Sequence, residues 1–428
     1  MILIISQTFI PDPAAVGQFM ADVAGEMSRR GHRVRVYTQD RGYEDPSLRF
    51  PRRETIAGAD VRRFRFASFG KKSILTRLIG TASFMIQSFW VMLFTPKLEG
   101  IFFSTSPPMI GLVASLAGLI RRVPVAYWAM DLNPDQLYAL GKLKPTDFTA
   151  RLIEAVNRFI LRRSSLVITL DRFMADSLKK RNVPDEKLLI LPPWPHEEHL
   201  KANDEVGTMN DEQNTDSFIV HRSSFIVSDN NPFRVRHNLV GKFVVMYSGN
   251  HSPSNPLDTL LQAMLAFKDD QDIRFLFVGG GLGKKAVEQF VVDHALTNVV
   301  CLPYQPLEEL KHSLRAADVH VVSLGEPMVG IVHPCKIYGA MAVGRPVLFL
   351  GPAPSHIADL MNGTDFGWHI RHGDVAGAVD AIRAIRSSSA DDLSAKGAAG
   401  QRLLNDQLGQ TRLLKTLADR LEQTFGGA

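Results

Sequence analysis

The sequence has little cysteine, and it lacks the features of a secreted chain. Its 428 residues include two cysteines, Cys301 and Cys335, which leaves no disulfide framework and favours a reducing compartment. Residues 1–6 contain neither a basic segment nor an apolar core of the length that a signal peptide needs. We therefore interpret them as a first buried strand and expect a cytoplasmic protein.

The sequence also lacks residues at the spacings that are typical of metal ligands. The thirteen histidines show no ligand spacing with cysteines or carboxylates, so we expect neither a metal site nor a cofactor. With 45% apolar and 22% charged residues, the composition is that of an ordinary globular enzyme. A chain of this length is too long for a single core and is typical of two domains.

Charge is missing from residues 78–96, a run that approaches the length of a membrane span. Its glycine, serine, threonine and glutamine residues make a buried or membrane-facing helix the better interpretation. Just before it, residues 49–77 hold nine basic and two acidic residues, a balance of +7 in a chain whose net charge is +5. A basic zone beside an apolar helix predicts peripheral contact with an anionic membrane, with a solvated basic loop as the alternative.

What the sequence does contain is a regular alternation of apolar runs and helical periodicity. Strands are predicted at residues 2–6, 33–37, 61–66, 101–104, 123–128, 166–169, 243–247, 273–278, 299–302, 319–323 and 346–350, and a first helix at 16–30. This βαβ order predicts an α/β fold with two Rossmann-like, doubly wound domains that face each other across a cleft.

Two domains are expected. Residues 1–200 form the first and residues 239–405 form the second. Between them, residues 201–238 are polar and are interpreted as a linker insertion, to which no chemistry is assigned. Residues 406–428 are predicted to form a C-terminal helix.

Small residues after the predicted strands are candidates for binding the phosphates of a nucleotide-sugar. They let backbone N–H groups approach a diphosphate, although tight packing alone also explains glycines at such positions. The candidates are Gly17 after the first strand, Gly249, Asn250 and His251 after strand 243–247, and Gly279 and Gly280 after strand 273–278.

Two further residues are candidates for catalysis. Lys336 follows Pro334 at the start of a predicted helix, where a cation would stabilise a leaving diphosphate. Asp131 stands at the carboxyl end of strand 123–128, near the expected place of the transferred sugar; an aspartate that only caps the next turn is the alternative. Tyr304, whose ring could hold a nucleobase, and Tyr338 are assigned to substrate binding.

Together these motifs resemble the family 4 glycosyltransferases, which have the GT-B fold, and in particular the branch that builds bacterial surface polysaccharides such as colanic acid and O-antigen. The resemblance covers nearly the whole chain except about residues 201–232. It rests on Gly31-His32-Arg33-Val34, Thr105-Ser106-Pro107-Pro108, Tyr247-Ser248-Gly249-Asn250, Pro334-Cys335-Lys336-Ile337-Tyr338-Gly339 and Met341-Ala342-Val343-Gly344-Arg345-Pro346-Val347.

The sequence departs from the wider family at two motifs. The family's pair of glutamates falls on Ile331 and Gly339, and its arginine and lysine, which grip the diphosphate, fall on Asn250 and Asn255 in an ungapped alignment. The polysaccharide branch resembles this sequence at those positions, so we interpret the departures as variation. They leave Lys336 as the phosphate cation and Glu326 as the candidate for the donor ribose.

The resemblance implies a retaining hexosyl- or N-acetylhexosaminyl-transferase, with residues 1–200 as the acceptor-side domain and residues 239–405 as the domain that binds the nucleotide-sugar. The donor would be a UDP-linked nucleotide-sugar and the acceptor a polysaccharide or a lipid-linked sugar, at the inner face of the cell membrane and without nucleic acid. The donor diphosphate would itself help to deprotonate the acceptor, so no side-chain nucleophile is expected. Two alternatives stay open: a nucleotide-sugar 2-epimerase on the same fold, and a non-catalytic nucleotide-sugar-binding partner of a transferase, which the glycine at 339 favours.

Overall fold

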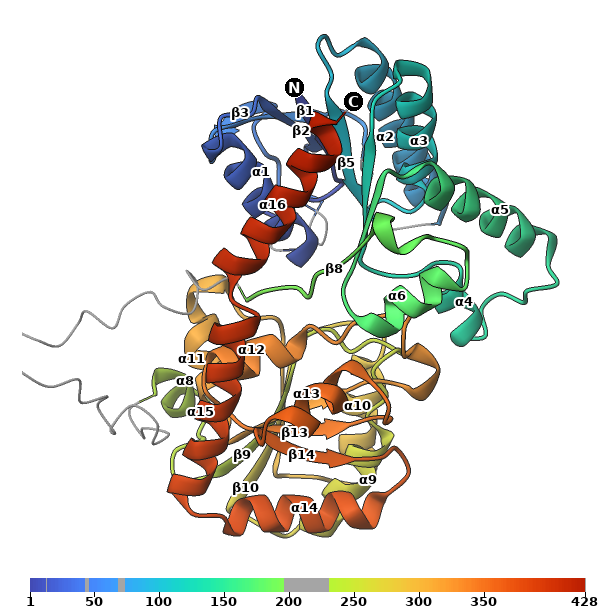
Figure 1. Ribbon diagram of the computed structural model, residues 1–428. Coiled ribbons are helices and arrows are strands. Elements are labelled where there is room, and N and C mark those ends of the chain that lie inside the picture. The colour runs from blue at the N-terminus through green and yellow to red at the C-terminus, as the bar shows by residue number, and fades with distance from the viewer. Residues whose placement is uncertain (13, 43–45, 68–73, 196–230, 428) are drawn as a thin grey trace, which may run out of the picture. The chain divides into compact units, whose positions relative to one another are not determined.

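The computed structural model describes residues 1–12, 14–42, 46–67, 74–195 and 231–427. The chain divides into two compact units (Figure 1). Unit 1 comprises Met1–Pro193, Gly330–His333 and Thr411–Ala428, and unit 2 comprises Trp194–Val329 and Pro334–Gln410. The insertion predicted at residues 201–238 lies, up to residue 230, outside the described residues. Each unit has its own mainly parallel sheet, so the prediction of two doubly wound α/β domains is confirmed.

Unit 1 is built on an eight-stranded sheet in the order β3-β4-β2-β1-β5-β6-β7-β8. Strand β1, in the middle, is an apolar run whose four residues are all buried, as expected for a parallel strand that is covered on both faces. The strands are β1 (Ile2–Ile5), β2 (Val34–Gln39), β3 (Arg53–Ile56), β4 (Ala59–Phe64), β5 (Gly100–Ser104), β6 (Val125–Ala129), β7 (Leu166–Thr169) and β8 (Leu188–Ile190).

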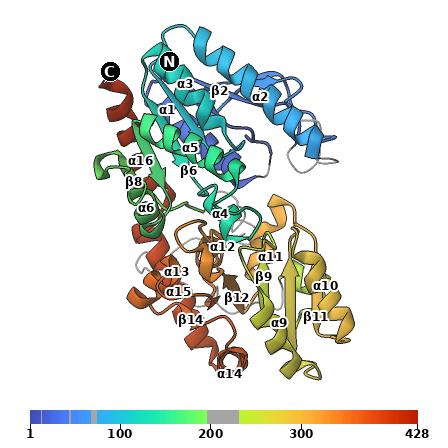
Figure 2. The same ribbon diagram turned by 90° about the vertical axis from the view of Figure 1, so that its right-hand side faces the viewer.

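Helices cover both faces of this sheet. Helices α1 and α16 lie on one face, and α2, α3 and α5 lie beside one another on the other (Figures 1 and 2). The helices are α1 (Ala15–Arg29), α2 (Ile74–Phe94), α3 (Ile110–Arg121), α4 (Asp135–Ala139), α5 (Phe148–Arg163), α6 (Arg172–Lys179) and α16 (Gln410–Gly426). Within the described ranges, no helix is long and apolar enough to cross a membrane.

Helix α2, which occupies the uncharged run predicted as a helix, has apolar residues on two faces. Phe84 and Met92 are fully buried against the rest of the unit. On the opposite side Ile86, Trp90 and Phe94, spaced by four residues, are 59%, 55% and 71% exposed. An amphipathic surface helix normally places polar residues on its outer face. The outer face of α2 therefore needs a further explanation.

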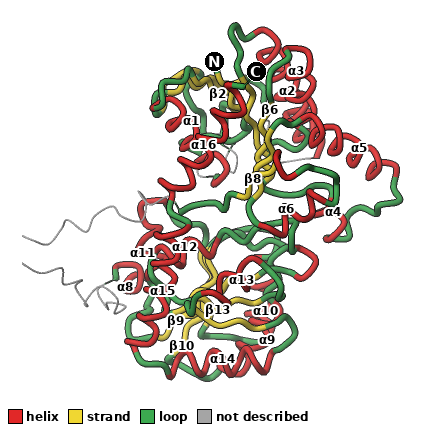
Figure 3. The backbone as a smooth tube through the Cα atoms, viewed as in Figure 1, coloured by secondary structure: helices red, strands yellow, loops and turns green. Residues whose placement is uncertain are grey.

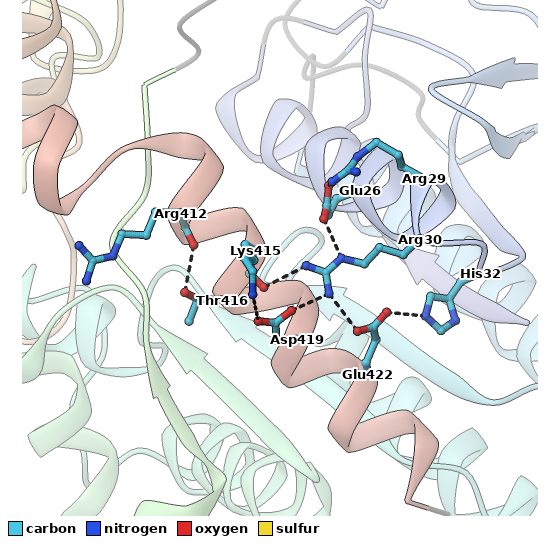
Figure 4. Close-up of polar contacts among 9 residues, drawn as sticks. All are labelled: Glu26, Arg29, Arg30, His32, Arg412, Lys415, Thr416, Asp419 and Glu422. Atoms are coloured by element: carbon cyan, nitrogen blue, oxygen red, sulfur yellow. Dashed lines mark hydrogen bonds and ion pairs between the residues drawn. The ribbon is translucent and has the colours of Figure 1, made fainter.

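The C-terminal helix α16 is held on unit 1 by charged residues (Figure 4). Arg30, which follows α1, donates from Nε to Glu26 (2.7 Å) and from Nη1 to Asp419 (2.6 Å) and Glu422 (2.9 Å). The Nε2 atom of His32 lies 2.9 Å from the other carboxylate oxygen of Glu422. One guanidinium among three carboxylates thus joins the first helix of the chain to the last.

Unit 2 contains a six-stranded parallel sheet in the order β11-β10-β9-β12-β13-β14 (Figure 3). Its strands are β9 (Phe243–Ser248), β10 (Ile273–Val278), β11 (Val299–Leu302), β12 (Val319–Ser323), β13 (Val347–Leu350) and β14 (Gly367–Ile370). Its helices are α8 (Pro232–Arg236), α9 (Asp258–Met264), α10 (Lys284–Asp293), α11 (Leu310–Arg315), α12 (Lys336–Ala342), α13 (His356–Gly363), α14 (Val375–Ser387) and α15 (Ala390–Gln407). The larger core cluster lies where α9 and α14 cover the sheet.

The predicted strands are all present, with boundaries that shift by at most two residues, and three strands were missed. These are β3, β8 and β14, each of which is the outermost strand of its sheet. An edge strand is covered less completely than a central one, so it does not need a continuous apolar run. The polar sequence of β3 and the three-residue length of β8 show why periodicity could not reveal them.

Candidate functional site

In unit 2, the turn after β9 contacts the first residue of α12. Gly249 has a φ of +125°, a backbone conformation that favours glycine, and a Cβ atom there would lie 2.9 Å from Cε of Lys336. Lys336 Nζ donates to Oδ1 of Asn255 (3.3 Å) and lies 5.2 Å from the centroid of the Tyr247 ring. We call Tyr247, Gly249, Asn255 and Lys336 the Lys336 cluster.

The positive charge of Lys336 is only weakly compensated within this cluster. Burial lowers the pKa of its ammonium group to about 8, because a charged group loses solvation inside a protein. Its partners in the cluster are an amide oxygen and an aromatic ring, neither of which carries a full negative charge. An anion such as a diphosphate would supply that charge, so the cluster favours an anionic ligand.

The glycine-rich loop after β10 packs on the same turn. Gly279 has a φ of +124°, and a side chain there would collide with the backbone of Gly249. The amide of His251 donates to the carbonyl oxygen of Gly280 (2.7 Å). These glycines therefore fix the shape of the turn that carries Gly249, and their direct contact with a phosphate stays a prediction.

Two neighbours in this turn differ in exposure. His251 is 1% exposed, and its Nδ1 lies 3.2 Å from the carbonyl oxygen of Gly280. Burial, helped by the charge of Lys284, lowers the pKa of His251 to about 4, so its ring is neutral at pH 7 and offers a phosphate no charge. Asn250, by contrast, is exposed, and its carbonyl oxygen accepts a hydrogen bond from the hydroxyl of Tyr247 (2.9 Å).

The other candidates of unit 2 lie in three different settings. Tyr304 is 55% exposed and its ring covers Gly280, where a Cβ atom would lie 3.0 Å from it. Glu326 is exposed at the start of a short 3-10 helix. Tyr338 is buried in α12, with its hydroxyl 3.1 Å from Nε2 of His356. Tyr304 therefore lies at the surface beside the glycine-rich loop, whereas Tyr338 is engaged within the unit.

In unit 1, Gly17 and Asp131 follow β1 and β6, which are parallel, so both lie toward the carboxyl edge of the sheet. A Cβ atom at Gly17 would lie 2.9 Å from the backbone of Phe9, so glycine lets α1 pack on the preceding loop. Asp131 lines a cavity of about 380 Å³ among α3, α4 and α5, and burial raises the pKa of its carboxyl to about 6. It makes no capping hydrogen bond to a described residue, which weighs against a purely capping role.

Sequence reasoning missed a buried acid–histidine pair in unit 1. His333 Nδ1 lies 2.7 Å from Oδ2 of Asp171, and the two side chains are 0% and 3% exposed. The other carboxylate oxygen of Asp171 caps α6 by accepting from the amide of Met174 (2.8 Å). The two partners are 162 positions apart, a pairing for which a single sequence carries no signal.

This pair anchors a short segment of the second half of the chain on unit 1. Gly330–His333 belongs to unit 1, although the residues on both sides of it belong to unit 2. The amide of Leu132, next to Asp131, donates to the carbonyl oxygen of Ile331 (3.0 Å). Within unit 1, the segment Gly330–His333 therefore contacts the loop that follows β6.

Taken together, the structure assembles the candidates into one group in each unit. In unit 2 it brings together Gly249, Asn250, His251, Gly279, Gly280, Tyr304 and Lys336, whereas Glu326 and Tyr338 lie outside these contacts. In unit 1 it places Asp131 in a cavity and Gly17 in a packed turn. Among the residues that the structure describes, no group of three or more His, Cys, Asp or Glu residues could hold a metal ion.

Comparison with known families defines the class of this protein. Residues 14–194 match the glycosyl transferase 4-like domain, and residues 242–388 match the glycosyl transferases group 1 domain. The first match contains the described strands of unit 1 except β1, and the second contains the described strands of unit 2. The chain belongs to the family 4 glycosyltransferases, which confirms the predicted family and the prediction of an enzyme.

The relatives agree with this class. The chain is 22% identical over 424 residues to the probable glycosyltransferase WbjE of Pseudomonas aeruginosa, covering 97% of this chain and 96% of the relative. It is 24% identical over 377 residues to the putative colanic acid biosynthesis glycosyl transferase WcaI of Escherichia coli K12, covering 84% and 85%. The crystal structure of Anabaena HepE in complex with UDP and glucose superposes with a TM-score of 0.69 at 16% identity, covering 98% and 99%. That likeness confirms the fold.

Proposed function

We propose that the protein transfers a hexosyl or N-acetylhexosaminyl group from a UDP-linked sugar to a polysaccharide or lipid-linked acceptor, with retention of anomeric configuration. Membership of the family supports transfer of a sugar, and the complex of HepE with UDP and glucose supports UDP as the carrier. The observation that carries the proposal is the Lys336 cluster, which holds a partly buried ammonium group in the same group of contacts as two exposed candidates, Asn250 and Tyr304.

In this proposal Lys336 stabilises the leaving diphosphate. With a pKa of about 8 the ammonium group is mostly charged at pH 7, and a bound anion raises that pKa further. Negative charge grows on the leaving diphosphate as the bond to the sugar breaks. A cation that is already in place interacts with this charge most strongly in the transition state, which is how preorganised charges accelerate such reactions.

The position of the Lys336 ammonium group supports the idea that this lysine takes the place of a lysine found elsewhere in the family's sequence. The wider family resembled by this chain carries a lysine where Asn255 stands, and Lys336 Nζ donates to the side chain of that same Asn255 (3.3 Å). The charge is thus present near the family's usual position but is carried by the first residue of α12. We infer that Lys336 replaces the missing lysine.

The reaction then needs no side-chain nucleophile and no metal ion. The bond from the anomeric carbon to the diphosphate oxygen breaks, the acceptor oxygen bonds to that carbon, and the acceptor proton passes to the leaving diphosphate. Asp131, at the carboxyl edge of unit 1, would accept a hydrogen bond from the acceptor hydroxyl and orient it.

A transfer assay tests this function. The purified chain is incubated with each of a panel of UDP-sugars, with and without bacterial membrane lipids, and with EDTA in parallel. We expect UDP release that needs both one donor and the lipid fraction, is insensitive to EDTA, and gives a product whose anomeric configuration by NMR matches the donor. An epimerised nucleotide-sugar formed without acceptor would establish the epimerase instead. Donor binding without release of UDP under any condition would favour the non-catalytic partner.

We further propose that unit 1 rests on an anionic membrane through the outer face of α2. Trp90 and Phe94 stack at 5.5 Å and are both exposed, and aromatic residues are favoured at membrane interfaces. Two exposed basic residues, Lys97 and Arg122, follow α2 and α3, whose ends are joined by a hydrogen bond from Arg121 to the carbonyl oxygen of Thr95 (3.0 Å). Apolar and basic groups therefore meet at one end of the helix pair.

The basic stretch before α2 contributes less to such contact than its charge implies. The side chain of Arg63 has no exposed surface and pairs with Glu54, and it donates to the carbonyl oxygen of Ile10 (2.9 Å). Arg62 pairs with Asp60 (3.0 Å). Lys71 and Lys72 lie outside the described residues. Part of the net charge of +7 on residues 49–77 is therefore paired within unit 1. For this reason the variant that tests membrane binding is made in α2.

Co-sedimentation with vesicles of phosphatidylglycerol and phosphatidylethanolamine tests this contact. Trp90→Glu should reduce the bound fraction about tenfold or more, because it replaces an apolar ring that the membrane would bury by a charge that the anionic surface repels. Val292→Glu, at a residue of α10 in unit 2 that is 73% exposed, is the matched control and should bind like the wild type. Equal binding by both variants would rule out the α2 surface.

A further inference from the structure

The cavity beside Asp131 is a binding site in its own right. It lies at the carboxyl ends of β5 and β6, and the start of α3, α4 and the inner side of α5 enclose it. Its volume of about 380 Å³ falls in the range of small-molecule sites. All the residues that line it belong to unit 1, so its shape depends on that unit alone.

Most of the wall is apolar. The rings of Phe103 and Tyr127 stack at 4.8 Å on one side, and Ile153 and Ile160 of α5 face the cavity from another. No lysine or arginine lines it, and Asp131 would repel a second negative charge. The cavity therefore disfavours a phosphate and favours an uncharged ligand with an apolar part.

Four polar side chains on the wall have no hydrogen-bond partner among the described residues. The side chains of Tyr127, Asp131, Asn133 and Asn157 line the cavity and make no hydrogen bond to a described residue. Tyr127 is 9% exposed, and a hydroxyl at such a depth normally has a partner. A phenol, a carboxyl and two amides that face one space supply both donors and acceptors, as a ligand with several hydroxyl groups needs.

We propose that this cavity binds the acceptor's terminal sugar and selects a sugar that carries a methyl group, such as a 6-deoxyhexose or an N-acetylhexosamine. The sugar hydroxyls pair with Asp131, Asn133 and Asn157, and the methyl group packs against Phe103 and Ile153. A lipid diphosphate attached to that sugar stays outside, because the cavity offers it no cation. The inference rests on the proposed transferase function and names the acceptor class of that site.

Matched pairs of methyl glycosides test this selection, since they differ in one group. Methyl α-L-fucoside is compared with methyl α-L-galactoside, and methyl N-acetyl-β-D-glucosaminide with methyl β-D-glucoside, by ligand-observed NMR titration of the full chain. We expect the methyl-bearing member of at least one pair to bind about fourfold or more tightly than its partner, the effect of burying one methyl group. A difference in affinity within the first pair would indicate a 6-deoxy sugar, and a difference within the second pair would indicate an N-acetyl sugar.

Two variants on α5 locate the binding. Ile153→Trp fills the cavity and should remove the binding of the preferred glycoside, whereas Leu152→Trp, at the neighbouring residue that is 54% exposed and outside the cavity, should keep it. UDP binding by both variants shows that they fold. Equal affinities within both pairs, no binding at tens of millimolar, or unchanged binding by Ile153→Trp would each overturn the inference. A failed transferase function would appear separately, as glycoside binding without any release of UDP.

Discussion

The two units use their polar side chains in opposite ways. Around Lys336 in unit 2 the groups partner one another: the amide of Asn255 donates to the carbonyl oxygen of Ser323 (2.6 Å) while its oxygen accepts from Lys336. In the cavity of unit 1, Asp131 and Asn157 make no hydrogen bond to a described residue. A preformed cation suits a ligand that is recognised by its charge, whereas unpaired polar groups on an apolar wall suit one that is recognised by its hydroxyl groups and shape.

Burial acts on the two catalytic candidates with opposite sign. It lowers the pKa of Lys336 to about 8 and raises the pKa of Asp131 to about 6, in each case because the charged form loses solvation. A bound diphosphate would restore the charge of Lys336. An uncharged sugar offers Asp131 hydrogen bonds but no counter-charge. This contrast supports our proposal that unit 2 binds the donor and unit 1 binds the acceptor, and the following experiments test that division.

The largest effect is expected for Lys336→Ala. It removes the cation that stabilises the leaving diphosphate, and the loss of one such preorganised group costs roughly 100- to 1,000-fold in kcat. Steady-state kinetics with the active donor measures it. Lys285→Ala, at an exposed lysine of α10, is the control and should keep wild-type rates. Normal turnover by Lys336→Ala would remove this residue from the site.

A somewhat smaller effect is expected for Asp131→Asn. Loss of the carboxylate that orients the acceptor should lower kcat on the order of 100-fold and leave the donor affinity unchanged. Because the folded state raises the pKa of Asp131, the stability it contributes falls as pH rises from its ordinary value of 3.8 to about 6. The variant should therefore unfold at a higher temperature than the wild type at pH 7. A lower unfolding temperature would indicate a structural role.

The same two groups predict the pH dependence of the enzyme. The value of kcat/KM should rise through about pH 6 as Asp131 ionises and fall through about pH 8 as Lys336 loses its proton. Asp131→Asn should abolish the acidic limb and keep the alkaline one. A wild-type profile that stays flat from pH 5 to pH 9 would show that neither group titrates in the free enzyme.

The smallest effect on activity is expected at the charged group of Figure 4, which lies in unit 1 and shares no residue with either candidate site. Hydrogen bonds from Lys415 and Arg30 lower the pKa of Asp419, and His32 and Arg30 do the same for Glu422. Such carboxylates stabilise the fold above their ordinary pKa values, and the contribution is lost as pH falls through the lowered ones. Arg30→Gln should lower the unfolding temperature at pH 7 by several degrees, lose this difference at low pH, and leave UDP binding unchanged. Calorimetry at pH 7 and pH 3 measures it, and equal stability at pH 7 would contradict the role of Arg30.

The sequence carried enough information for the central strands and for the turns that follow them. Runs such as residues 273–278 are apolar because parallel strands are covered on both faces, and they can be recognised one at a time. Gly249 and Lys336 were identified because each belongs to a local motif. Their contact across 87 positions could not be predicted, since it depends on where the start of α12 lies against the turn that follows β9.

The rest of the site depends on burial and on pairing between distant residues. The roles of Gly279 and His251 in packing become visible only when the two turns are seen against each other. The His333–Asp171 pair joins residues that no sequence motif connects. The outer face of α2 shows the same limit, because periodicity identified its helix but could not tell that Trp90 stays exposed.

The division of labour between the units is tested most directly by titrating UDP, without any acceptor, into the wild type, Lys336→Ala and Asp131→Asn by isothermal titration calorimetry. The account predicts that Lys336→Ala binds UDP at least tenfold more weakly, because the variant lacks the ammonium group that we propose to contact the diphosphate. It predicts that Asp131→Asn binds UDP like the wild type. The same affinity in all three proteins, or a loss of binding in Asp131→Asn alone, would contradict the assignment of the donor to unit 2 and the acceptor to unit 1.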